Sequence, residues 1–490
     1  MPDINSILEN ENFGQVINNL CVDTMEYRTP REYLEEYNGE RKRRKTSVGW
    51  REPKKLAVYS ETLKDALGNP LKIEDKTVDV ARIVTNFPKK VVRTSVAFMF
   101  GGRMTISAED QNDGFKEFKR VWERKLKMQA ILKEFSRKVL SETKAAIVFY
   151  PSISKRFDGS KSAELKAKIL SQPIQDTVTS EFYPHFDDND DMDGFIHKFQ
   201  IRVDGVTRDR AIIWTSEKIV TGTQSYGGWE VVEAANLFGL IPVVYAETQK
   251  PEWDEIAPVM DAREMRLSRM ADTNDYFAEP IMKTFGETDL PSKNTVGKEI
   301  SFPIKVDPDS QKEYHGDAEF LAWQQSIDSV KKELEETKDE MDGGSATPDF
   351  SFNNMKGIGN LSGVSRKFMT LDATIKASEN MEIFGPAKQR CVSVIVAGIA
   401  NITNIKYRQQ LIDNWITVDF DSILPKDPVE DANVLSIANG GKAFNSQQTI
   451  VTNSPLTPSG DVEGEIARMA DDAKAEATLT SSIGANAFGG

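Results

Sequence analysis

The apolar stripe between Phe320 and Met341 is the feature of the sequence that most constrains the fold. Its members recur at spacings of three and four, with the last one heptad after the fifth: Phe320, Trp323, Ile327, Val330, Leu334 and Met341. This spacing predicts one long helix over Asp317–Met341, roughly 37 Å in length at about 1.5 Å per residue. Asp342-Gly343-Gly344-Ser345 should end it. Taken alone, the stripe fits a helix packed on a core or a coiled-coil dimer.

A second long helix is predicted before this one. Pro258 suits a first turn, and Pro280 predicts an end after Ala278. The helix has few apolar residues, and Arg263, Arg266 and Arg269 recur at every third position, so we do not expect it to be buried on all sides. The segment between the two helices, Pro280–Gly316, contains the strand-like Glu299–Val306 and is too short for a core of its own. We interpret it as a small insertion between two long helices.

A loop and a third helix follow. Gly343–Gly363 is rich in Gly, Asn and Ser. Ser362 is a candidate N-cap for a helix with Val364, Phe368, Leu371 and Ile375 on one face. Gly385-Pro386 should break or kink this helix before the apolar segment Cys391–Ile402.

Composition excludes several classes of function. The chain has 490 residues, enough for roughly three domains, and a net charge of −14, so binding of nucleic acid by a broadly basic surface is not expected. The N-terminus lacks the order of a signal peptide, and no apolar run reaches the ~18 residues of a membrane span. Two cysteines, Cys21 and Cys391, suit a reducing compartment and form no metal or disulfide pattern.

Two basic stretches stand out in the N-terminal third. Arg41–Lys45 is a run of five basic residues, which predicts a solvated arm or, alternatively, a contact with DNA or an acidic partner. Phe115–Leu140 is predicted to be the most basic helix, with the same alternatives for its charged face. Between them, Val80–Ile106 has a helical pattern that kinks or begins at Pro88. The apolar side of the basic helix consists of Phe118, Trp122, Leu132, Phe135 and Val139.

From Ala145 to Val244 the pattern is that of short strands separated by turns. Asp204-Gly205 predicts a tight hairpin turn. The acidic cluster Asp187–Gly194 fails as an EF-hand loop, because Gln200 stands where a bidentate Glu is needed. An acidic turn between strands is the better interpretation, with a weak ion site left open. The predicted strands are Ala146–Tyr150, Phe195–Val203, Arg210–Thr215, Lys218–Thr221 and Trp229–Val232.

The C-terminal part predicts a strand over Trp415–Phe420. Short helices are expected over Val429–Ala438 and Val462–Ala473, and the Ser/Gly/Ala-rich tail after them is predicted to be disordered.

Catalytic motifs are mostly absent from the sequence. Gly357-Ile358-Gly359 follows no strand and lacks the third glycine of a dinucleotide site, and Ser436 stands where a phosphate-binding loop before Gly441 needs glycine. No G-x-S-x-G, H-E-x-x-H or C-x-x-C occurs. We therefore expect no enzyme, no cofactor and no metal. The alternative is a metal-dependent DNA-processing enzyme that uses scattered carboxylates.

In its order of motifs the chain resembles the portal proteins of tailed bacteriophages, across roughly residues 80–470. Four segments carry the resemblance: Asn86–Ile106 with its Phe98-Met99-Phe100-Gly101-Gly102 end; Gly239–Tyr245 followed by Met260-Asp261 and Asp272; Thr347-Pro348-Asp349 with Gly357–Gly363; and Val418-Asp419-Phe420 with Leu424–Asp427, Ser446–Thr449 and Asp461-Val462-Glu463. The basic run Arg41–Lys45 departs from the family pattern. A different connector or adaptor ring is a further alternative, although such chains are usually much shorter.

The resemblance implies a ring, usually a dodecamer, of mainly helical α+β subunits with long stem helices, a small β-rich wing region and a short clip insertion. By position, the wing comprises residues 1–253 and 364–425, and the stem comprises 254–279 and 317–343. The clip is 280–316, the tunnel loop 344–363, and the crown with a flexible tail 426–490.

The resemblance also implies the functional residues and partners. The second stem segment, with seven acidic residues against three lysines over Asp328–Asp342, would repel the DNA backbone. Expected partners are double-stranded DNA, the terminase large subunit, a head-completion or adaptor protein, and the major capsid protein with scaffold, but no membrane. The location would be the virion, after assembly in the host cytoplasm. The implied sites are the tunnel loop (Phe350, Phe352, Asn353, Asn354, Met355, Lys356), the channel-lining stem (Glu333, Glu336, Asp339, Glu340), the stem basic stripe (Arg263, Arg266, Arg269) and the clip contact (Lys283, Lys293, Lys298, Lys305).

Overall fold

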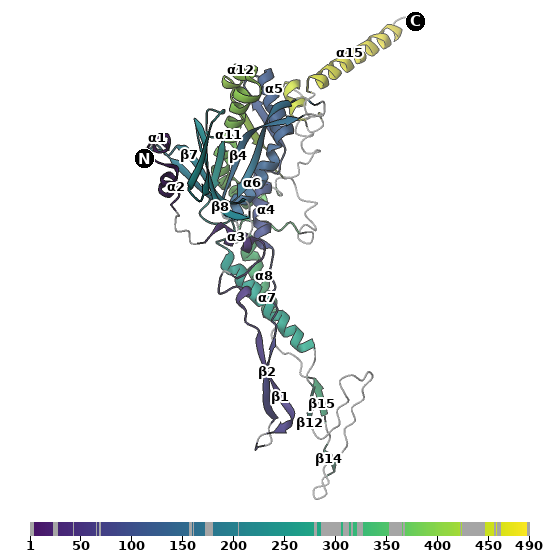
Figure 1. The fold of residues 1–490 in the computed structure, drawn as a ribbon. Coiled ribbons are helices and arrows are strands. Elements are labelled where there is room, and N and C mark those ends of the chain that lie inside the picture. Colours follow the sequence, from purple (N-terminus) through teal and green to yellow (C-terminus); the bar gives the residue numbers. More distant parts are fainter. Residues whose placement is uncertain are drawn as a thin grey trace. The chain divides into compact units, whose positions relative to one another are not determined.

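The computed structural model describes the following residues: 4–22, 28–42, 44–64, 66–67, 70–155, 159, 161–171, 180–203, 205–278, 282–285, 305–306, 313–314, 317–320, 327–351, 365, 368–421, 423, 446–454, 457 and 462–487. They form two compact units. The first comprises Met1–Pro348 with Ile375–Asp421, and the second comprises Asp349–Thr374 with Ser422–Gly490. Helices and strands are both abundant, so the predicted α+β class is confirmed (Figure 1).

A five-stranded antiparallel sheet lies in the first unit, in the order β10-β9-β8-β7-β6. Four of its strands were predicted, and β6 was not. Val203 pairs with Val206 and Gly205 has a φ of +79°, which agrees with the predicted hairpin, although Asp204 lies outside the described residues. The strands are β6 (Ser180–Phe186), β7 (Met192–Val203), β8 (Val206–Thr215), β9 (Lys218–Ser225) and β10 (Gly228–Ala235).

A three-stranded sheet, in the order β11-β4-β5, packs against the five-stranded one. Its central strand β4 alternates strictly, as successive side chains in a strand point to opposite faces. Ala146 and Val148 pack toward the larger sheet, and Ile147 and Phe149 pack toward the helices. The strands are β4 (Lys144–Lys155), β5 (Lys161–Ser171) and β11 (Val243–Glu247), of which only part of β4 was predicted as a strand.

Helices cover the two outer faces of this pair of sheets. Phe384 lies at the centre of the larger core, with ring centroids 6.3 Å from Phe100 and 6.0 Å from Phe135. On the other side, Phe13 packs so closely on the five-stranded sheet that a Cβ at Gly222 would lie 2.1 Å from its ring. The first layer consists of α4 (Phe87–Phe100), α5 (Asp113–Arg120), α6 (Met128–Glu142) and α11 (Leu371–Gly398), and the second of α1 (Ile4–Asn10) and α2 (Phe13–Leu20).

The basic segment Phe115–Leu140 is not one helix, contrary to the prediction. After α5 the chain makes a π-helical segment over Val121–Leu126, and Lys127 has a left-handed φ of +54° before α6 begins. Its predicted apolar side chains are all buried. The wider π turn keeps Val121, Trp122 and Leu126 in the core together, and burial of these side chains outweighs regular helix geometry.

Gly385-Pro386 was predicted to break or kink the third helix, and the break does not occur. Helix α11 continues through Pro386, with Phe384 and Cys391 buried on either side of it, and a π-helical segment, Ile399–Thr403, follows. Leu371–Thr403 is long and apolar enough to cross a membrane by length and composition, but half of its apolar 18-residue stretch is buried inside the protein. The buried side chains of Val394, Ile395 and Ile399 account for its apolar character as part of the core.

The helix predicted within Val80–Ile106 is shorter than expected, and the end of this segment is a strand. The pattern Val80–Ile106 becomes helical at Phe87, with Pro88 in the first turn, and the helix ends at Phe100. Met104–Ala108 is instead a strand, β3, which pairs with the predicted strand β16 (Ile416–Phe420). Between α11 and β16 lies α12 (Arg408–Ile412).

The acidic cluster forms a turn between strands, as predicted. The carboxylate of Asp187 accepts hydrogen bonds from the backbone N–H groups of Asn189 (2.8 Å) and Asp191 (2.9 Å). These bonds hold the pKa of Asp187 below its usual value.

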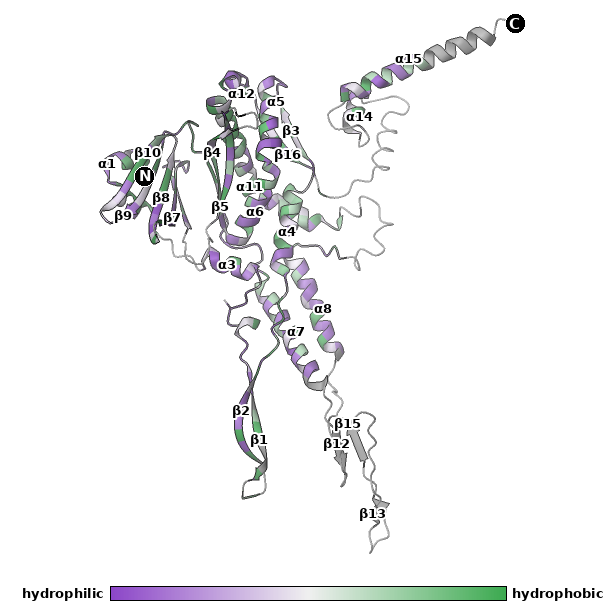
Figure 2. Cartoon of the chain, turned by 45° about the vertical axis from the view of Figure 1, so that its right-hand side comes forward, coloured by the Kyte–Doolittle hydropathy of each residue, from purple (hydrophilic) through white to green (hydrophobic). Residues whose placement is uncertain are grey.

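The predicted stem helices are α7 (Ala257–Ala278) and α8 (Ile327–Gly344). Hydrophilic residues run along both of them (Figure 2). The prediction that the second helix begins at Asp317 is wrong, because Asp317–Phe320 is strand β15 and pairs with β12 (Met282–Phe285). Asp-Ala-Glu-Phe alternates polar with apolar residues, so its pattern also suits a strand. Of Pro280–Gly316, the other described strands are β13 (Lys305–Val306) and β14 (Glu313–Tyr314); Trp323 lies outside the described residues.

A two-stranded hairpin that was not predicted precedes α4. Its strands are β1 (Lys54–Lys64) and β2 (Pro70–Val78), and most of its described side chains are exposed. Helix α3 (Pro30–Tyr37), which begins with a Thr29–Glu32 capping box, and a 3-10 turn at Val48–Trp50 lead into it.

In the second unit, Ser446 caps α14 (Gln447–Asn453) by accepting a hydrogen bond from the Thr449 N–H (3.2 Å). Helix α15 (Val462–Ala487) is about twice as long as predicted and includes most of the tail that was expected to be disordered. The predicted helix Val429–Ala438 lies outside the described residues.

Candidate functional site

Two of the three arginines of the stem basic stripe make contacts within the same chain. Arg266 forms an ion pair with Glu333 of α8 (2.7 Å). Arg263 donates to the Leu334 carbonyl oxygen and, at 3.4 Å, to Thr337 Oγ1. Burial lowers the pKa of the Arg263 guanidinium. Arg269 is exposed. Two of the three predicted residues therefore hold α7 and α8 together.

The acidic stem residues divide in the same way. Glu333 faces α7 through its pair with Arg266. Glu336, Asp339 and Glu340 are exposed, and Glu336 lies 3.6 Å from Lys332 in a pair that is exposed on both sides. An exposed acidic surface on α8 is thus present without Glu333.

The other predicted sites are only partly described. In the tunnel loop, Phe350 is exposed, whereas Phe352, Asn353, Asn354, Met355 and Lys356 lie outside the described residues. In the clip, Lys283 belongs to β12 and Lys305 to β13, and Lys293 and Lys298 lie outside the described part.

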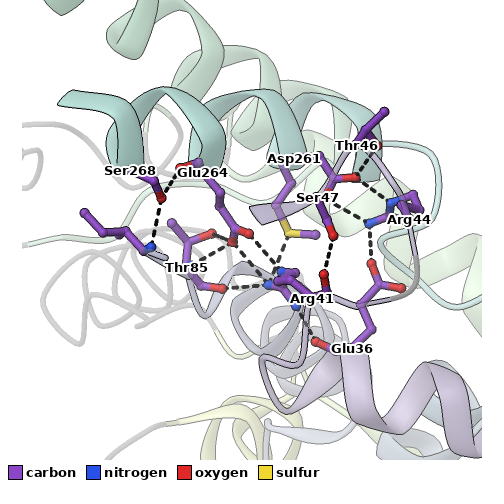
Figure 3. A network of polar contacts seen from close by, with 11 residues as sticks. Glu36, Arg41, Arg44, Thr46, Ser47, Thr85, Asp261, Glu264 and Ser268 are labelled. Atoms are coloured by element: carbon purple, nitrogen blue, oxygen red, sulfur yellow. Dashed lines mark hydrogen bonds and ion pairs between the residues drawn. The ribbon is translucent and has the colours of Figure 1, made fainter. Parts of the chain in front are cut away.

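The most developed polar site is one that the sequence did not reveal, and it is built on α7. We call the segments 40–55 and 79–85, which flank the β1–β2 hairpin, the α7 clamp. Figure 3 shows Arg41 directed at Glu264 of α7. Arg41 Nε lies 2.9 Å from Glu264 Oε2, and the exposed fractions of the two side chains are 1% and 0%. The guanidinium also donates to the carbonyl oxygens of Glu36 (2.6 Å) and Thr85 (2.9 Å).

Arg44 makes a second buried pair, one turn toward the start of α7. Its Nε lies 2.7 Å from Asp261 Oδ2, and its Nη2 contacts Glu36 of α3. Thr46 donates to the same Asp261 oxygen at 3.2 Å. Burial alone would lower the pKa of Arg44, but Asp261 and Glu36 outweigh it and raise the pKa.

The clamp is also bonded to α7 near its other end. Arg51 Nη2 lies 2.6 Å from Asp272 Oδ2, and Asp272 Oδ1 accepts the Ala81 N–H (2.8 Å). Burial would raise the pKa of Asp272, yet the Ala81 and Arg51 hydrogen bonds hold it below its usual value. Ser268 accepts the Ile83 N–H (2.9 Å).

The local sequence of the clamp suits this close approach. Ser47 Oγ donates to the Arg41 carbonyl oxygen, and a Cβ at Gly49 would lie 1.8 Å from that same oxygen. Only glycine fits there, so the chain can fold back on Arg41 and present Arg41, Arg44 and Arg51 to one helix.

The predicted solvated arm at Arg41–Lys45 is therefore corrected: the structure buries Arg41, and leaves the Arg44 side chain only 16% exposed, against acidic residues of the same chain. The residues meet across more than two hundred positions, which no local pattern encodes. The one available signal was the spacing of Asp261, Glu264, Ser268 and Asp272, which places four short polar side chains on one face of α7.

The arrangement can bind and position chain segments, and its chemistry is that of a scaffold. In the described part of the chain, no group of three or more His, Cys, Asp and Glu side chains could hold a metal ion. Ser180 and His197 are 2.9 Å apart, but both are buried, and burial lowers the pKa of His197 to about 3. A histidine with that pKa is a poor general base at neutral pH.

Comparison with known proteins gives one family. The profile of the phage portal proteins described as SPP1 Gp6-like matches residues 23–479. A search of curated proteins found no match. Among solved structures, a chain described as part of the neck of a native GTA particle computed with C12 symmetry is similar, at 10% identity and a TM-score of 0.39. The match covers 76% of this chain and 91% of that one. Because the family profile spans most of the sequence, the chain belongs to the SPP1 Gp6-like phage portal proteins, structural proteins of the bacteriophage head-to-tail connector.

Proposed function

We propose that copies of this chain form a ring at one vertex of the capsid, and that the genome is packaged and ejected through its central channel. The observation that supports this most directly, beside the family, is the pair of long helices α7 and α8 joined by Arg263 and Arg266, with a small strand-bearing segment between them in sequence. In this proposal the pair is the stem and Pro280–Gly316 is the clip.

The acidic surface of α8 lines part of the channel in this proposal. Glu336, Asp339 and Glu340 are exposed, so their charges are available to repel DNA phosphates. Binding to DNA derives mainly from cations that displace its counterions, so an acidic wall lets the duplex pass without adhering. Glu333 contributes less, because Arg266 neutralises it.

The remaining contacts follow from position in the chain. The tunnel loop, with Phe350 and the segment Phe352–Lys356, surrounds the duplex. The clip lysines contact the packaging ATPase during filling and a head-completion protein afterwards. Capsid protein and scaffold surround the ring in the virion after assembly in the host cytoplasm.

Electron microscopy of the purified protein tests the ring. We expect rings with a central hole, and a compact dimer or a monomer at every concentration would contradict the proposal. Deletion of Thr347–Leu361 should leave the rings intact and abolish DNA packaging. Loss of the rings, or unchanged packaging, would contradict the role given to the loop.

A metal-dependent cleavage assay separates the alternative class. Incubation of the protein with duplex DNA and Mg²⁺ or Mn²⁺ should leave the DNA intact. Cleavage that chelator abolishes would favour a DNA-processing enzyme.

A further inference from the structure

The α7 clamp has an outward surface that the described part of the chain leaves exposed. Trp50 and Ile83 of the clamp are 54% and 38% exposed, and Val78 beside the clamp is 36% exposed. Five described basic side chains are exposed there, against three acidic ones: Lys42, Lys45, Lys54, Lys55 and Arg82, against Glu40, Glu52 and Asp79. Lys54 lies 3.6 Å from Asp272; within the described residues, no ion pair involves Lys42, Lys45 or Lys55. Trp is enriched at protein interfaces, and exposed cations select an acidic partner surface.

Helix α7 lies between the clamp and α8. Successive residues of a helix are about 100° apart around its axis. Asp261, Glu264 and Ser268, which bind the clamp, are therefore on the opposite side of α7 from Arg263 and Arg266, which bind α8. The clamp and α8 of one chain are thus separated by the thickness of a helix.

Helix α8 carries the complementary surface. The residues that face α7 are Glu333, Thr337 and the buried Met341, and Asp328 and Glu335 are on the opposite side of the helix. The exposed charged residues of α8 are Asp328, Glu335, Glu336, Asp339 and Glu340, against Lys331 and Lys332. Lys332 is already close to Glu336.

The order clamp–α7–α8 therefore has a basic, Trp-bearing surface at one end and an acidic surface at the other. We propose that the outward surface of the α7 clamp docks on the Asp328–Glu335 side of α8 in a second copy of this chain. Such a contact joins different surfaces of two identical chains, and interfaces of this kind form a ring when the rotation between neighbouring chains closes. The inference deepens the proposed ring by naming one of its contacts.

The hairpin gives a second reason for a partner at this position. An isolated two-stranded hairpin is only marginally stable in water. Strands β1 and β2 pair with each other alone among the described strands, and Leu71 and Ile73 are 44% and 60% exposed. A neighbouring stem against the base of the hairpin would cover part of this apolar area.

Charge reversal tests the contact. In Lys42→Glu/Lys55→Glu, we expect the protein concentration needed for half-maximal ring formation, measured by mass photometry, to rise roughly tenfold or more. Both lysines are exposed, so the thermal unfolding of the chain should not change. Adding Asp328→Lys/Glu335→Lys to the same chain should restore assembly.

A matched control uses the same helix and the same change in charge. Adding Glu336→Lys/Glu340→Lys instead should not restore assembly, because these side chains lie on a different edge of α8. Unchanged assembly of the clamp variant, or equal rescue by both pairs, would overturn the contact. Loss of duplex DNA binding without loss of assembly would assign the surface to DNA.

Cross-linking makes the contact testable apart from ring closure. In a Cys21→Ser background, chains with Lys55→Cys are mixed with chains with Glu335→Cys, and a short thiol cross-linker is added. Dimers containing one chain of each kind are expected; rings without such dimers would refute the docking and leave the proposed function standing. Absence of rings at every concentration would count against the proposed function, and the mixed dimers would still report on the contact.

Discussion

The core around Phe384 and the α7 clamp stabilise two parts of the same unit by opposite means. In the core, apolar side chains from β4, α4, α6 and α11 are buried together, and burial is favourable in any orientation that fills the space. In the clamp, buried arginines meet buried carboxylates, and such contacts are favourable only in one geometry. The core therefore depends on volume, and the clamp depends on the pairing of particular atoms.

Ionisable groups show the same contrast. In the clamp, Arg44 and Asp272 have pKa values shifted toward their charged forms by their partners. In the layered part, burial raises the pKa of Glu142 to about 7 and lowers that of His197 to about 3. The clamp retains its charges in pairs, whereas the layered part favours the neutral forms of these two groups.

The largest effect is expected from breaking a buried pair. Arg41→Ala leaves Glu264 without its counter-ion inside the protein, and we expect a loss of about 3–5 kcal/mol in the free energy of unfolding, measured by urea denaturation. The matched control is Arg31→Ala, which breaks an Arg–Glu pair with side chains 51% and 36% exposed. That change should cost less than about 1 kcal/mol. Equal losses would remove the distinction between the two environments.

A conservative pair of substitutions compares the two regions directly. Arg41→Lys retains the charge but cannot reach Glu264 and the Thr85 carbonyl oxygen together, so we expect a loss of about 2–3 kcal/mol. Phe135→Leu in the core retains an apolar side chain and should cost about 1–1.5 kcal/mol. A milder effect of Arg41→Lys than of Phe135→Leu would contradict the view that geometry matters more in the clamp.

The pH dependence of the free energy of unfolding tests whether burial favours the neutral form of Glu142. Its pKa in the folded protein is raised above the ordinary 4.5, so its destabilising contribution is absent below pH 4.5, grows up to about pH 7 and is then constant. Relative to wild type, Glu142→Gln should therefore gain about 3 kcal/mol of stability between pH 4.5 and 7.5. Unfolding free energies of both proteins across this range give the difference. A difference that does not change with pH would show that Glu142 is charged when folded.

The smallest effect is expected on the opposite face of α7. Arg266 and Glu333 are 41% and 44% exposed, so Arg266→Ala should cost at most about 1 kcal/mol. The loss should decrease further in 1 M NaCl, because salt screens exposed charges. A loss as large as that of Arg41→Ala, at high salt as well, would mean that the two faces of α7 do not differ.

Prediction from sequence succeeded where a local period carried the information. Strands β7–β10, the turn near Gly205 and helix α7 follow from alternation, turn residues and prolines. Prediction failed at Pro386 and Lys127, where packing of distant side chains outweighs the local preference to end or continue a helix. It also failed at Asp317–Phe320, whose pattern fits both the helical period and the alternation of a strand. The clamp could not be predicted, because in the local sequence Arg41 and Glu264 look like ordinary surface residues, although both are buried.

The spacing of the carboxylates on α7 gives the clamp a single register. Arg44, Arg41 and Arg51 pair with Asp261, Glu264 and Asp272. A slip of four residues forward would offer them Met265, Ser268 and Tyr276, and four residues backward Ala257, Met260 and Ser268. Either slip would leave Arg41 and Arg51 without a carboxylate and Arg44 with Glu36 alone. Loss of the partner of a buried charge costs several kcal/mol. The three ion pairs thus fix the position of the hairpin base along α7, and this position must be the same in every copy of the chain.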